Sequence, residues 1–259
     1  MKLSFYKYQG TGNDFIIIDN RQLIFDKNNA ILVANLCDRR FGIGGDGLIL
    51  LENHPTEDFK MVYFNSDGNE SSMCGNGGRC IVAFAKDLGL ITFKATFEAI
   101  DGLHKAEITN DIVELQMQNV SKIENHQSHL FLDTGSPHHV ELTENIESLN
   151  IKEKGAKIRY GDTYGEKGSN VNFVKQLSKN RFAIRTYERG VEDETLSCGT
   201  GVTAVALAMH NLGKSSSHSI QLKTQGGDLT VRFKKSDQGY HDIWLIGAAT
   251  FVFKGEVEC

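Results

Sequence analysis

The feature that most limits how this 259-residue chain can fold is an internal repeat. Residues 70–85 and 194–208 each place a cysteine and a Gly-x-Gly sequence directly before an apolar, alanine-rich stretch. The cysteines are Cys74 and Cys198, 124 positions apart. Because self-similarity at a fixed offset indicates repeated structural units, the chain is expected to contain two similar halves.

The repeat extends well beyond the two cysteines. At an offset of 123 positions, the aligned segments are 10–13 with 133–136, 46–51 with 169–174, and 59–65 with 182–188. One residue is then inserted, after which Cys74 aligns with Cys198 and Gly102 with Gly226. These five pairs of positions align with a single inserted residue, which predicts a duplicated unit of about 120 residues.

Local patterns within the repeat indicate an α+β unit. Short β-rich runs bounded by Gly, Asn and Asp predict strands over residues 14–19, 48–51 and 59–64. Helical spacing predicts helices from residue 75 to about 89 and from 199 to about 213, and two or three strands follow each helix. We therefore expect two pseudo-symmetric halves, each a strongly curved sheet around a central helix, with the active site in the cleft between them.

The expected domain boundaries follow the repeat. Residues 1–120 form the N-terminal half, which carries Cys74, and residues 121–245 form the C-terminal half, which carries Cys198. Residues 246–259 are expected to form a terminal strand that can pair with either half, the N-terminal half included.

Composition and charge exclude several classes of function. The net charge of −5 and the pI near 6.0 argue against nucleic-acid binding. The N-terminus lacks an apolar secretory region, and no run of about 18 apolar residues is present, so we expect a cytoplasmic protein without membrane contact. None of the five cysteines forms C-x-x-C, which weakens a zinc or thioredoxin-like site. Cys37, Cys80 and Cys259 are expected to be inert, buried thiols.

The two remaining cysteines suggest acid–base chemistry. A cysteine at a helix N-terminus faces backbone N–H groups and the positive end of the helix dipole, which favour its thiolate. Each Gly-x-Gly turn can present N–H groups to a carboxylate or phosphate. A thiolate on one side of a carbon and a thiol on the other can invert that carbon by removing and returning a proton. Donors to the substrate carboxylate would stabilise the developing charge.

The sequence resembles the diaminopimelate epimerases, which are pyridoxal-phosphate-independent enzymes of lysine and peptidoglycan precursor synthesis. The resemblance covers essentially the whole chain. Its motifs lie at residues 10–15, 38–47, 64–68, 73–80, 136–138, 168–172, 187–190 and 197–201. It implies a homodimer that acts on the small molecule diaminopimelate and uses no cofactor and no metal.

The resemblance also implies residue roles. Cys198 would abstract and Cys74 would donate the proton in the LL-to-meso direction, with His138 and Glu188 orienting or tuning the thiols. The reacting carboxylate would be held by Gly75, Asn76, Gly199 and Thr200. The other amino and carboxyl groups would be held by Asn13, Asn65, Asn170, Glu188 and Arg189. Two positions depart from the family pattern: Gly47 stands where a glutamine often binds substrate, and Ser136 where an asparagine does.

The sequence leaves four other functions as alternatives. The first is an epimerase or racemase of another amino acid, such as proline or hydroxyproline; the extra asparagines and Arg189 favour a substrate with two amino-acid ends. A pyridoxal or phosphate-ligand enzyme would need a lysine near a cysteine turn, and neither turn has one. A thiol redox or metal-binding protein would need closely spaced cysteines. A non-catalytic binding module is the fourth alternative.

Overall fold

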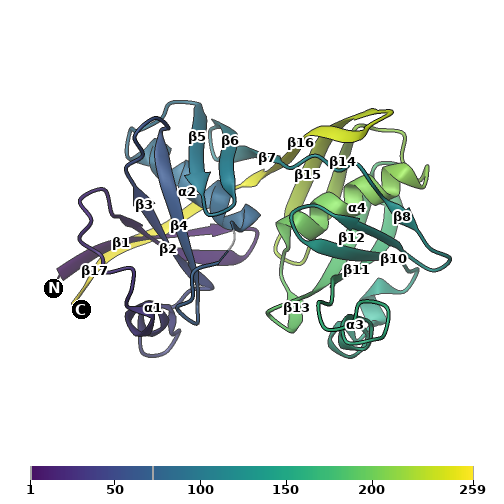
Figure 1. The fold of residues 1–259 in the computed structure, drawn as a ribbon, viewed down its shortest axis with the longest axis horizontal. Helices are drawn as coiled ribbons and strands as arrows, with labels where there is room; N and C mark the ends of the chain where they lie inside the picture. The colour runs from purple at the N-terminus through teal and green to yellow at the C-terminus, as the bar shows by residue number, and fades with distance from the viewer. Residues whose placement is uncertain (1, 72, 259) are drawn as a thin grey trace. The chain divides into compact units, whose positions relative to one another are not determined.

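The computed structural model describes residues 2–71 and 73–258, which form two compact units (Figure 1). Unit 1 consists of Met1–Leu115 and Gly247–Cys259, and unit 2 consists of Gln116–Ile246. The C-terminal segment of the chain therefore belongs with the N-terminal residues. Cys259, expected above to be an inert thiol, lies outside the described residues.

Unit 1 is a mixed sheet that packs on one long helix. Its elements are β1 (Lys2–Gly10), β2 (Asn13–Asp19), α1 (Ala30–Cys37), β3 (Gly47–Glu52), β4 (Phe59–Asn65), α2 (Gly75–Asp87), β5 (Lys94–Ala99), β6 (Gly102–Thr109), β7 (Ile112–Met117) and β17 (Thr250–Glu258). Neighbouring strands pair in the order β17-β1-β2-β3-β4-β5-β6-β7. The pairs β2–β3 and β4–β5 are parallel, and the others are antiparallel.

Unit 2 repeats this topology. Its elements are β8 (Glu124–Asn125), β9 (Leu130–Asp133), β10 (Pro137–Leu142), the 3₁₀ helix η1 (Ile146–Ser148), α3 (Ile151–Arg159), β11 (Asn170–Ser178), β12 (Arg181–Glu188), β13 (Asp193–Thr195), α4 (Gly199–Asn211), β14 (Ser219–Lys223), β15 (Asp228–Ser236) and β16 (Gly239–Ala248). From β9 to β16, the sequence of parallel and antiparallel pairs matches that from β1 to β7. The α+β class and the duplication predicted from the sequence are confirmed.

The central helices α2 and α4 follow the same local rules. Each has 13 residues and begins directly after a cysteine, and a glycine in the left-handed region follows the C-cap residue of each helix, Gly89 (φ 73°) after α2 and Gly213 (φ 69°) after α4. The backbone N–H of Gly89 donates to Lys86 and that of Leu90 to Ala85, which is the Schellman pattern, and the end of α4 repeats it. The glycines thus explain why both predicted helices stop where they do.

Each central helix packs against the sheet of its own unit. Helix α2 contacts β1, β2, β3 and β6, and α4 contacts β9, β10, β11, β12, β14 and β15. Between Cys80 and Ala85, every α2 side chain is at most 6% exposed, and the core of α4 from Val202 to Met209 is fully buried. Because they are enclosed in this way, the helices are held by tertiary packing, which places their N-termini reproducibly.

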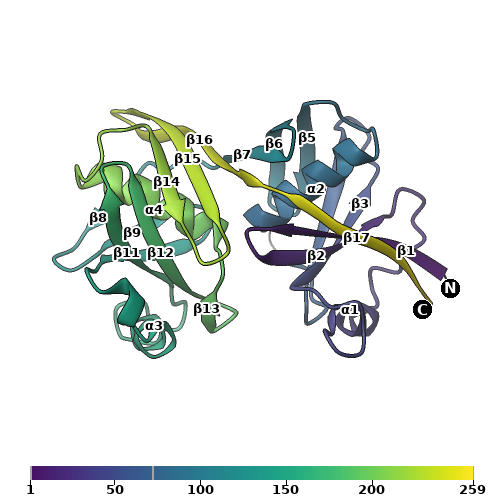
Figure 2. The ribbon, with the colours of Figure 1, turned by 180° about the vertical axis from the view of Figure 1, so that it is seen from behind.

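Strand β17 lies along β1 in antiparallel register, from Lys2 opposite Glu258 to Gln9 opposite Thr250 (Figure 2). Three consecutive apolar residues of β17 are exposed: Phe251 (45%), Val252 (51%) and Phe253 (44%). A run of exposed large apolar side chains on a strand is unusual in a monomer and indicates an interaction surface.

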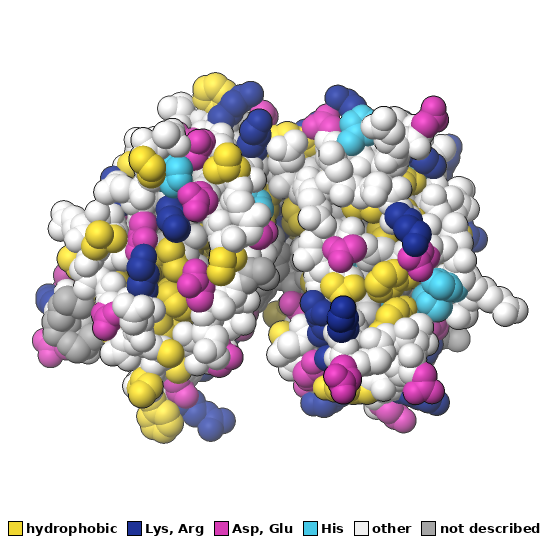
Figure 3. All heavy atoms as spheres, viewed as in Figure 1, with side chains coloured by type: hydrophobic (Ala, Val, Ile, Leu, Met, Phe, Trp, Pro, Cys, Tyr) yellow, Lys and Arg dark blue, Asp and Glu magenta, His cyan; other side chains and the backbone are white. Residues whose placement is uncertain are grey.

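Charged side chains of both signs are found elsewhere on the surface. On the face shown in Figure 3, Lys and Arg side chains are interspersed with Asp and Glu side chains. Several form ion pairs, such as Lys152 with Asp193 at 2.6 Å. Within residues 2–71 and 73–258, no helix has the length and apolar character needed to cross a bilayer.

Candidate active site

In unit 1, the fold brings the predicted site residues to one edge of the sheet. Asn13 begins β2, Gly47 begins the parallel strand β3, and Asn65 ends the antiparallel strand β4. The register pairs Phe15 with Gly47 and Gly47 with Asn65, so these strand ends are adjacent. Cys74 is the N-cap residue of α2.

Unit 2 builds an equivalent site from equivalent positions. Ser136 directly precedes β10, Asn170 begins the parallel strand β11, and Glu188 ends the antiparallel strand β12. Cys198 is the N-cap residue of α4. In both halves, the predicted residues thus stand at equivalent places, at the ends of neighbouring strands and at the start of the central helix, as the repeat requires.

Both cysteines stand where a helix leaves its first N–H groups available. The carbonyl of Cys74 accepts the first helical bond of α2 from Gly78 at 2.7 Å, and that of Cys198 accepts from Val202 at 2.9 Å. Within the described residues, neither N-cap side chain makes a capping hydrogen bond with a backbone N–H of its helix. A helix start without a side-chain cap can bind an anion, and the first residues of these two helices are Gly75–Asn76 and Gly199–Thr200.

The polar groups around Cys74 are connected by hydrogen bonds. Its sulfur lies 3.6 Å from Asn13 Oδ1, to which the thiol donates. Asn76 Nδ2 donates to the same oxygen at 3.1 Å, and Asn13 Nδ2 donates to Asp46 Oδ2 at 2.6 Å. Two predicted substrate-binding residues thus contact each other next to the thiol, and Asp46, which sequence reasoning did not select, holds one of them.

In unit 2, Asn170 links the residues predicted to hold the distal end of a substrate. Its Nδ2 donates to Ser136 Oγ at 2.9 Å, and its Oδ1 accepts from the backbone N–H of Arg189 at 2.8 Å. The Arg189 guanidinium also reaches Ser136 Oγ at 3.4 Å. The Ser136 hydroxyl is therefore in contact with two other residues of the predicted site, Asn170 and Arg189.

His138 is fully buried and is held by a residue that sequence reasoning missed. Asn172 Nδ2 donates to His138 Nδ1 at 3.1 Å and to the carbonyl of His139 at 2.9 Å, while Asn172 Oδ1 accepts from Thr186. Because an amide N–H can only donate, His138 carries its proton on Nε2, which has no hydrogen-bond partner among the described residues. Burial, with the charge of Arg189 adding to it, lowers the pKa of His138 to about 3.

The other predicted groups of unit 2 lie close to α4. Glu188 Oε2 accepts from the hydroxyl of Thr195 at 3.0 Å. The Thr200 hydroxyl lies 3.4 Å from the sulfur of Cys198, and the Thr200 carbonyl accepts from Thr134 at 2.9 Å. The first turn of α4 is thereby tied to the loop before β10.

Gly47 faces a space that another side chain already fills. A Cβ at this position would lie 2.6 Å from the ring of Tyr63 and 2.5 Å from the carbonyl oxygen of Phe64. Tyr63, on the neighbouring strand β4, thus occupies the volume that a glutamine at position 47 would need. The absence of a side chain at Gly47 reflects this packing, and Tyr63 is a residue of the site edge that sequence reasoning missed.

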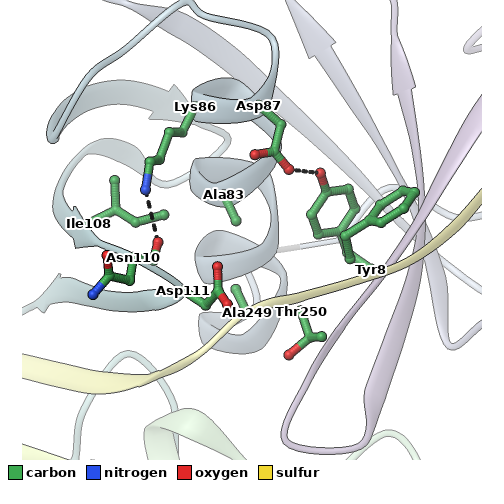
Figure 4. A pocket seen from close by; sticks show the side chains of 10 residues that line it. Tyr8, Ala83, Lys86, Asp87, Ile108, Asn110, Asp111, Ala249 and Thr250 are labelled. Atoms are coloured by element: carbon green, nitrogen blue, oxygen red, sulfur yellow. Dashed lines mark hydrogen bonds between the residues drawn. The ribbon is translucent and has the colours of Figure 1, made fainter.

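Two cavities lie away from these residues. One, of about 170 Å³, is at the C-terminal end of α2, where Tyr8 donates to Asp87 and Lys86 donates to the carbonyl of Asn110 (Figure 4). The second, of about 660 Å³, is in unit 2 beside α3 and is bordered by His129 and His139. Neither is lined by a residue of the predicted site.

Comparison with known proteins gives the family. The model of the family described as diaminopimelate epimerase matches residues 5–123 and 130–252. A diaminopimelate epimerase of Flavobacterium psychrophilum is 61% identical over 255 residues, covering 98% of this chain and 99% of the relative. One of Chlorobaculum tepidum is 43% identical, covering 96% of this chain and 98% of the relative.

Solved structures show the same fold at low sequence identity. A PhzF-family phenazine biosynthesis protein of Bacillus anthracis matches with a TM-score of 0.80 at 13% identity, covering all of both chains. A hydroxyproline epimerase from Agrobacterium vitis matches with a TM-score of 0.68 at 15% identity, covering 99% of this chain and 92% of that one. At these identities the likeness supports the duplicated α+β fold alone. The match to the family model and the identities to the two diaminopimelate epimerases above show that this chain belongs to the diaminopimelate epimerase family.

Proposed function

We propose that this protein interconverts LL- and meso-2,6-diaminopimelate by moving one proton at Cα. The observation that carries the proposal is that both halves of a diaminopimelate epimerase-family chain place a cysteine at the N-cap of the central helix. Inversion at carbon needs one group to remove a proton and a second group to return one from the opposite face. Cys74 and Cys198 are the matched pair that can do both.

In the LL-to-meso direction, the proposed reaction has two proton transfers. The Cys198 thiolate takes the α-proton, the electron pair stays on the substrate as a carbanion delocalised into its carboxylate, and the Cys74 thiol supplies the new proton. The proton has then moved from carbon to Cys198 and from Cys74 to carbon, so the thiolate ends on Cys74. The reverse reaction starts from that state. No pyridoxal phosphate takes part in these steps.

The difficult step is removal of a weakly acidic proton, and the helix starts supply the stabilisation. The N–H groups of Gly75–Asn76 and Gly199–Thr200 are proposed to bind the carboxylate on which charge develops, because each pair opens a helix. Removing one well-placed donor from such a site typically costs about 2.7–4 kcal/mol of transition-state stabilisation. Two helix starts therefore provide a large share of the required effect.

The remaining predicted residues serve the ends of the substrate. Asn13 and Asn65 in unit 1, and Asn170, Glu188 and Arg189 in unit 2, are proposed to bind its amino and carboxyl groups. Arg189 is suited to the carboxylate of the unreacting end, because a guanidinium binds carboxylates through two parallel hydrogen bonds. His138 is neutral near pH 7, since its pKa is lowered to about 3, so its proposed role is to orient groups rather than to carry charge.

The decisive experiment measures how fast the wild type and its cysteine variants convert diaminopimelate, and whether the wild type converts other amino acids. Purified protein is expected to convert LL-diaminopimelate to the meso form under reducing conditions, without added pyridoxal phosphate or metal. Cys74→Ala and Cys198→Ala are each expected to abolish conversion, whereas Cys37→Ala, which alters a buried thiol, keeps it. Turnover of L-proline or trans-4-hydroxy-L-proline, with none of diaminopimelate, would instead support the alternative epimerase of another amino acid.

The protein is further proposed to act in the cytoplasm as a homodimer that associates through β17. The exposed apolar run on that strand supports this, because homodimer interfaces are enriched in apolar surface. Val252→Lys is expected to yield a monomer in sedimentation equilibrium, and Leu177→Lys, at an exposed apolar residue of β11, serves as the matched control. A wild-type monomer, or a dimer that survives the first substitution and not the second, contradicts this assignment.

A further inference from the structure

A chain of four side chains runs beside Cys74, and its two ends carry opposite charges. Asp46 Oδ2 accepts from Asn13 Nδ2 at 2.6 Å, and Asn13 Oδ1 accepts from Asn76 Nδ2 at 3.1 Å. Asn76 Oδ1 in turn accepts from the Arg79 guanidinium at 3.0 Å. The Cys74 thiol contacts this chain at Asn13 Oδ1, 3.6 Å from its sulfur.

The charged ends determine which way both amides point. A carboxylate only accepts hydrogen bonds, so Asp46 requires the Nδ2 of Asn13 and leaves its Oδ1 for the thiol. A guanidinium only donates, so Arg79 requires the Oδ1 of Asn76 and leaves its Nδ2 for Asn13. A flip of either amide would place two donors or two acceptors together. The group that Asn13 offers to Cys74 is therefore an acceptor.

Both ends are themselves held in place. Asp46 Oδ1 accepts from the Arg39 guanidinium at 2.7 Å, and this anchors the carboxylate on the side away from Asn13. Arg79 is 0% exposed, and none of its partners among the described residues is a carboxylate. Burial lowers its pKa, so the fold bears a cost by keeping a cation in the first turns of α2, where the helix dipole also disfavours it.

The second half of the chain lacks this device. At the repeat offsets, Asp46, Asn13, Asn76 and Arg79 correspond to Ser169, Ser136, Thr200 and Thr203. Each of these is a hydroxyl, which can rotate to donate or to accept. The Thr200 hydroxyl lies 3.4 Å from the sulfur of Cys198, and either atom can be the donor. In unit 1, the group next to the thiol is therefore fixed as a hydrogen-bond acceptor, whereas in unit 2 the neighbouring hydroxyl can donate or accept.

We propose that Asp46 and Arg79 are positioning residues that act from opposite ends of this chain to keep Asn13 Oδ1 facing Cys74. An acceptor in that position stabilises the protonated thiol relative to the thiolate, whereas the charge of Arg79, which also interacts with Cys74, favours the thiolate. The proposal rests on the proposed function in assigning Cys74 the acid role in the LL-to-meso direction. It adds the reason why the two thiols, which the repeat makes equivalent, hold their protons differently before the substrate binds.

The test is the pH dependence of alkylation at Cys74. The variants carry Cys198→Ala, and carbamidomethylation of Cys74 by iodoacetamide is followed by peptide mass spectrometry from pH 5 to 10. Asp46 Oδ2 accepts from Asn13 Nδ2 and from the backbone N–H of Asp14. In Asp46→Asn, the charged Arg39 is expected to retain the oxygen of the introduced amide, so the NH₂ group takes the place of Oδ2 and turns the Asn13 amide. A donor then faces the sulfur, and the pH midpoint of alkylation is expected to fall by about 0.5–1 unit.

Charge alone is controlled by Asp14→Asn. Asp14 also pairs with Arg39 and is a neighbour of Asp46 in the same ion-pair cluster, but no hydrogen bond joins its side chain to that of Asn13. Its midpoint shift is expected to be less than half of that in Asp46→Asn. Arg79→Lys, which keeps a donor-only group, is expected to retain the wild-type midpoint.

Dependence on both ends is measured by a double-mutant cycle of Asp46→Asn and Arg79→Met. If both residues act through one hydrogen-bonded chain, the midpoint shift of the double variant is expected to differ from the sum of the two single-variant shifts by at least about 0.3 pH units. If the two residues act only as independent charges, the shifts add. Equal shifts in Asp46→Asn and Asp14→Asn, or an additive cycle, overturn the proposal. If Arg79→Met does not fold, the comparison of the two aspartate variants still decides. Because alkylation needs no turnover, a wild type that fails to convert diaminopimelate contradicts only the proposed function.

Discussion

His138 gives a prediction whose size follows from the structure. The imidazole is fully buried and neutral, with a pKa of about 3 in place of the ordinary 6.5. The unfolded chain therefore binds a proton at this residue between about pH 6.5 and pH 3, and the folded chain does not. Stability is complete above pH 6.5 and is lost as the pH falls through this window. From pH 7.5 to pH 5.0, the loss from this residue is about 2 kcal/mol, at 1.36 kcal/mol for each pH unit below 6.5.

The assay compares urea unfolding of the wild type and His138→Asn at pH 7.5 and pH 5.0, at one protein concentration. Asparagine keeps an acceptor near the position of Nδ1 for the Asn172 amide but does not titrate. Trp244, the single tryptophan of the chain, lies in unit 2 with His138, so its fluorescence reports the relevant unit. The wild type is expected to lose about 2 kcal/mol more than the variant on acidification.

His129, whose pKa is lowered to about 4 mainly by burial, contributes in the same direction. It is present in both proteins, so it cancels from the comparison. His241→Asn measures the effect of losing any imidazole from unit 2. A difference between the wild type and His138→Asn below about 0.5 kcal/mol would refute the claim that His138 is held neutral by burial.

Other predictions concern glycines. Gly47→Gln is expected to destabilise the fold by about 1–3 kcal/mol because its side chain meets the ring of Tyr63. Adding Tyr63→Ala to this variant is expected to recover part of the lost stability, as measured by thermal denaturation. Gly213→Ala is expected to cost only the left-handed backbone energy, about 1–2 kcal/mol, since no atom lies within 4 Å of the new Cβ. Gly155, in α3, packs against Tyr187, and a Cβ at Gly155 would lie 2.3 Å from that of Tyr187, so Gly155→Ala is expected to lower the melting temperature further; equal effects of these two alanine variants would contradict this close contact.

Much of the fold could be predicted because its signals are local or periodic. The ends of α2 and α4 are set by Gly89 and Gly213, and the strand runs 14–19, 48–51 and 59–64 coincide with β2, β3 and β4. The repeat then transfers each local assignment to the other half. The helices α1 and α3 and the short strands β8 and β13 were not predicted, because they carry no motif that the repeat duplicates.

The site was predictable in its cysteines but not in its supporting contacts. The Cys-Gly-x-Gly turns mark Cys74 and Cys198 directly in the sequence. The roles of Asp46, Arg79 and Asn172 depend on partners 33, 3 and 34 positions away and on which atom of an amide faces which neighbour. Pairing between strands brings Asp46 to Asn13 and Asn172 to His138, whereas Arg79 reaches Asn76 across one turn of α2. In each case, the orientation of an amide depends on neighbours that no motif in the sequence marks.

Tyr63 illustrates the same limit at Gly47. The sequence shows that position 47 departs from the family pattern, and it indicates a lost contact. The structure shows that the ring of Tyr63, reached across the β3–β4 pair, fills the space. A change at one position is therefore linked to a residue 16 positions away that no motif connects with it.

The central claim is that two thiols divide the work at one carbon, and a deuterium experiment tests it most directly. LL-diaminopimelate is incubated with the protein in deuterated water, and early samples are analysed for deuterium at Cα in the product and in the unreacted substrate. Two bases predict a product that carries solvent deuterium at the inverted centre while the remaining substrate stays unlabelled. Label entering the unreacted LL substrate as fast as the meso product forms would show that a single base exchanges its proton with solvent, and the assignment of Cys74 and Cys198 as an acid–base pair would be wrong.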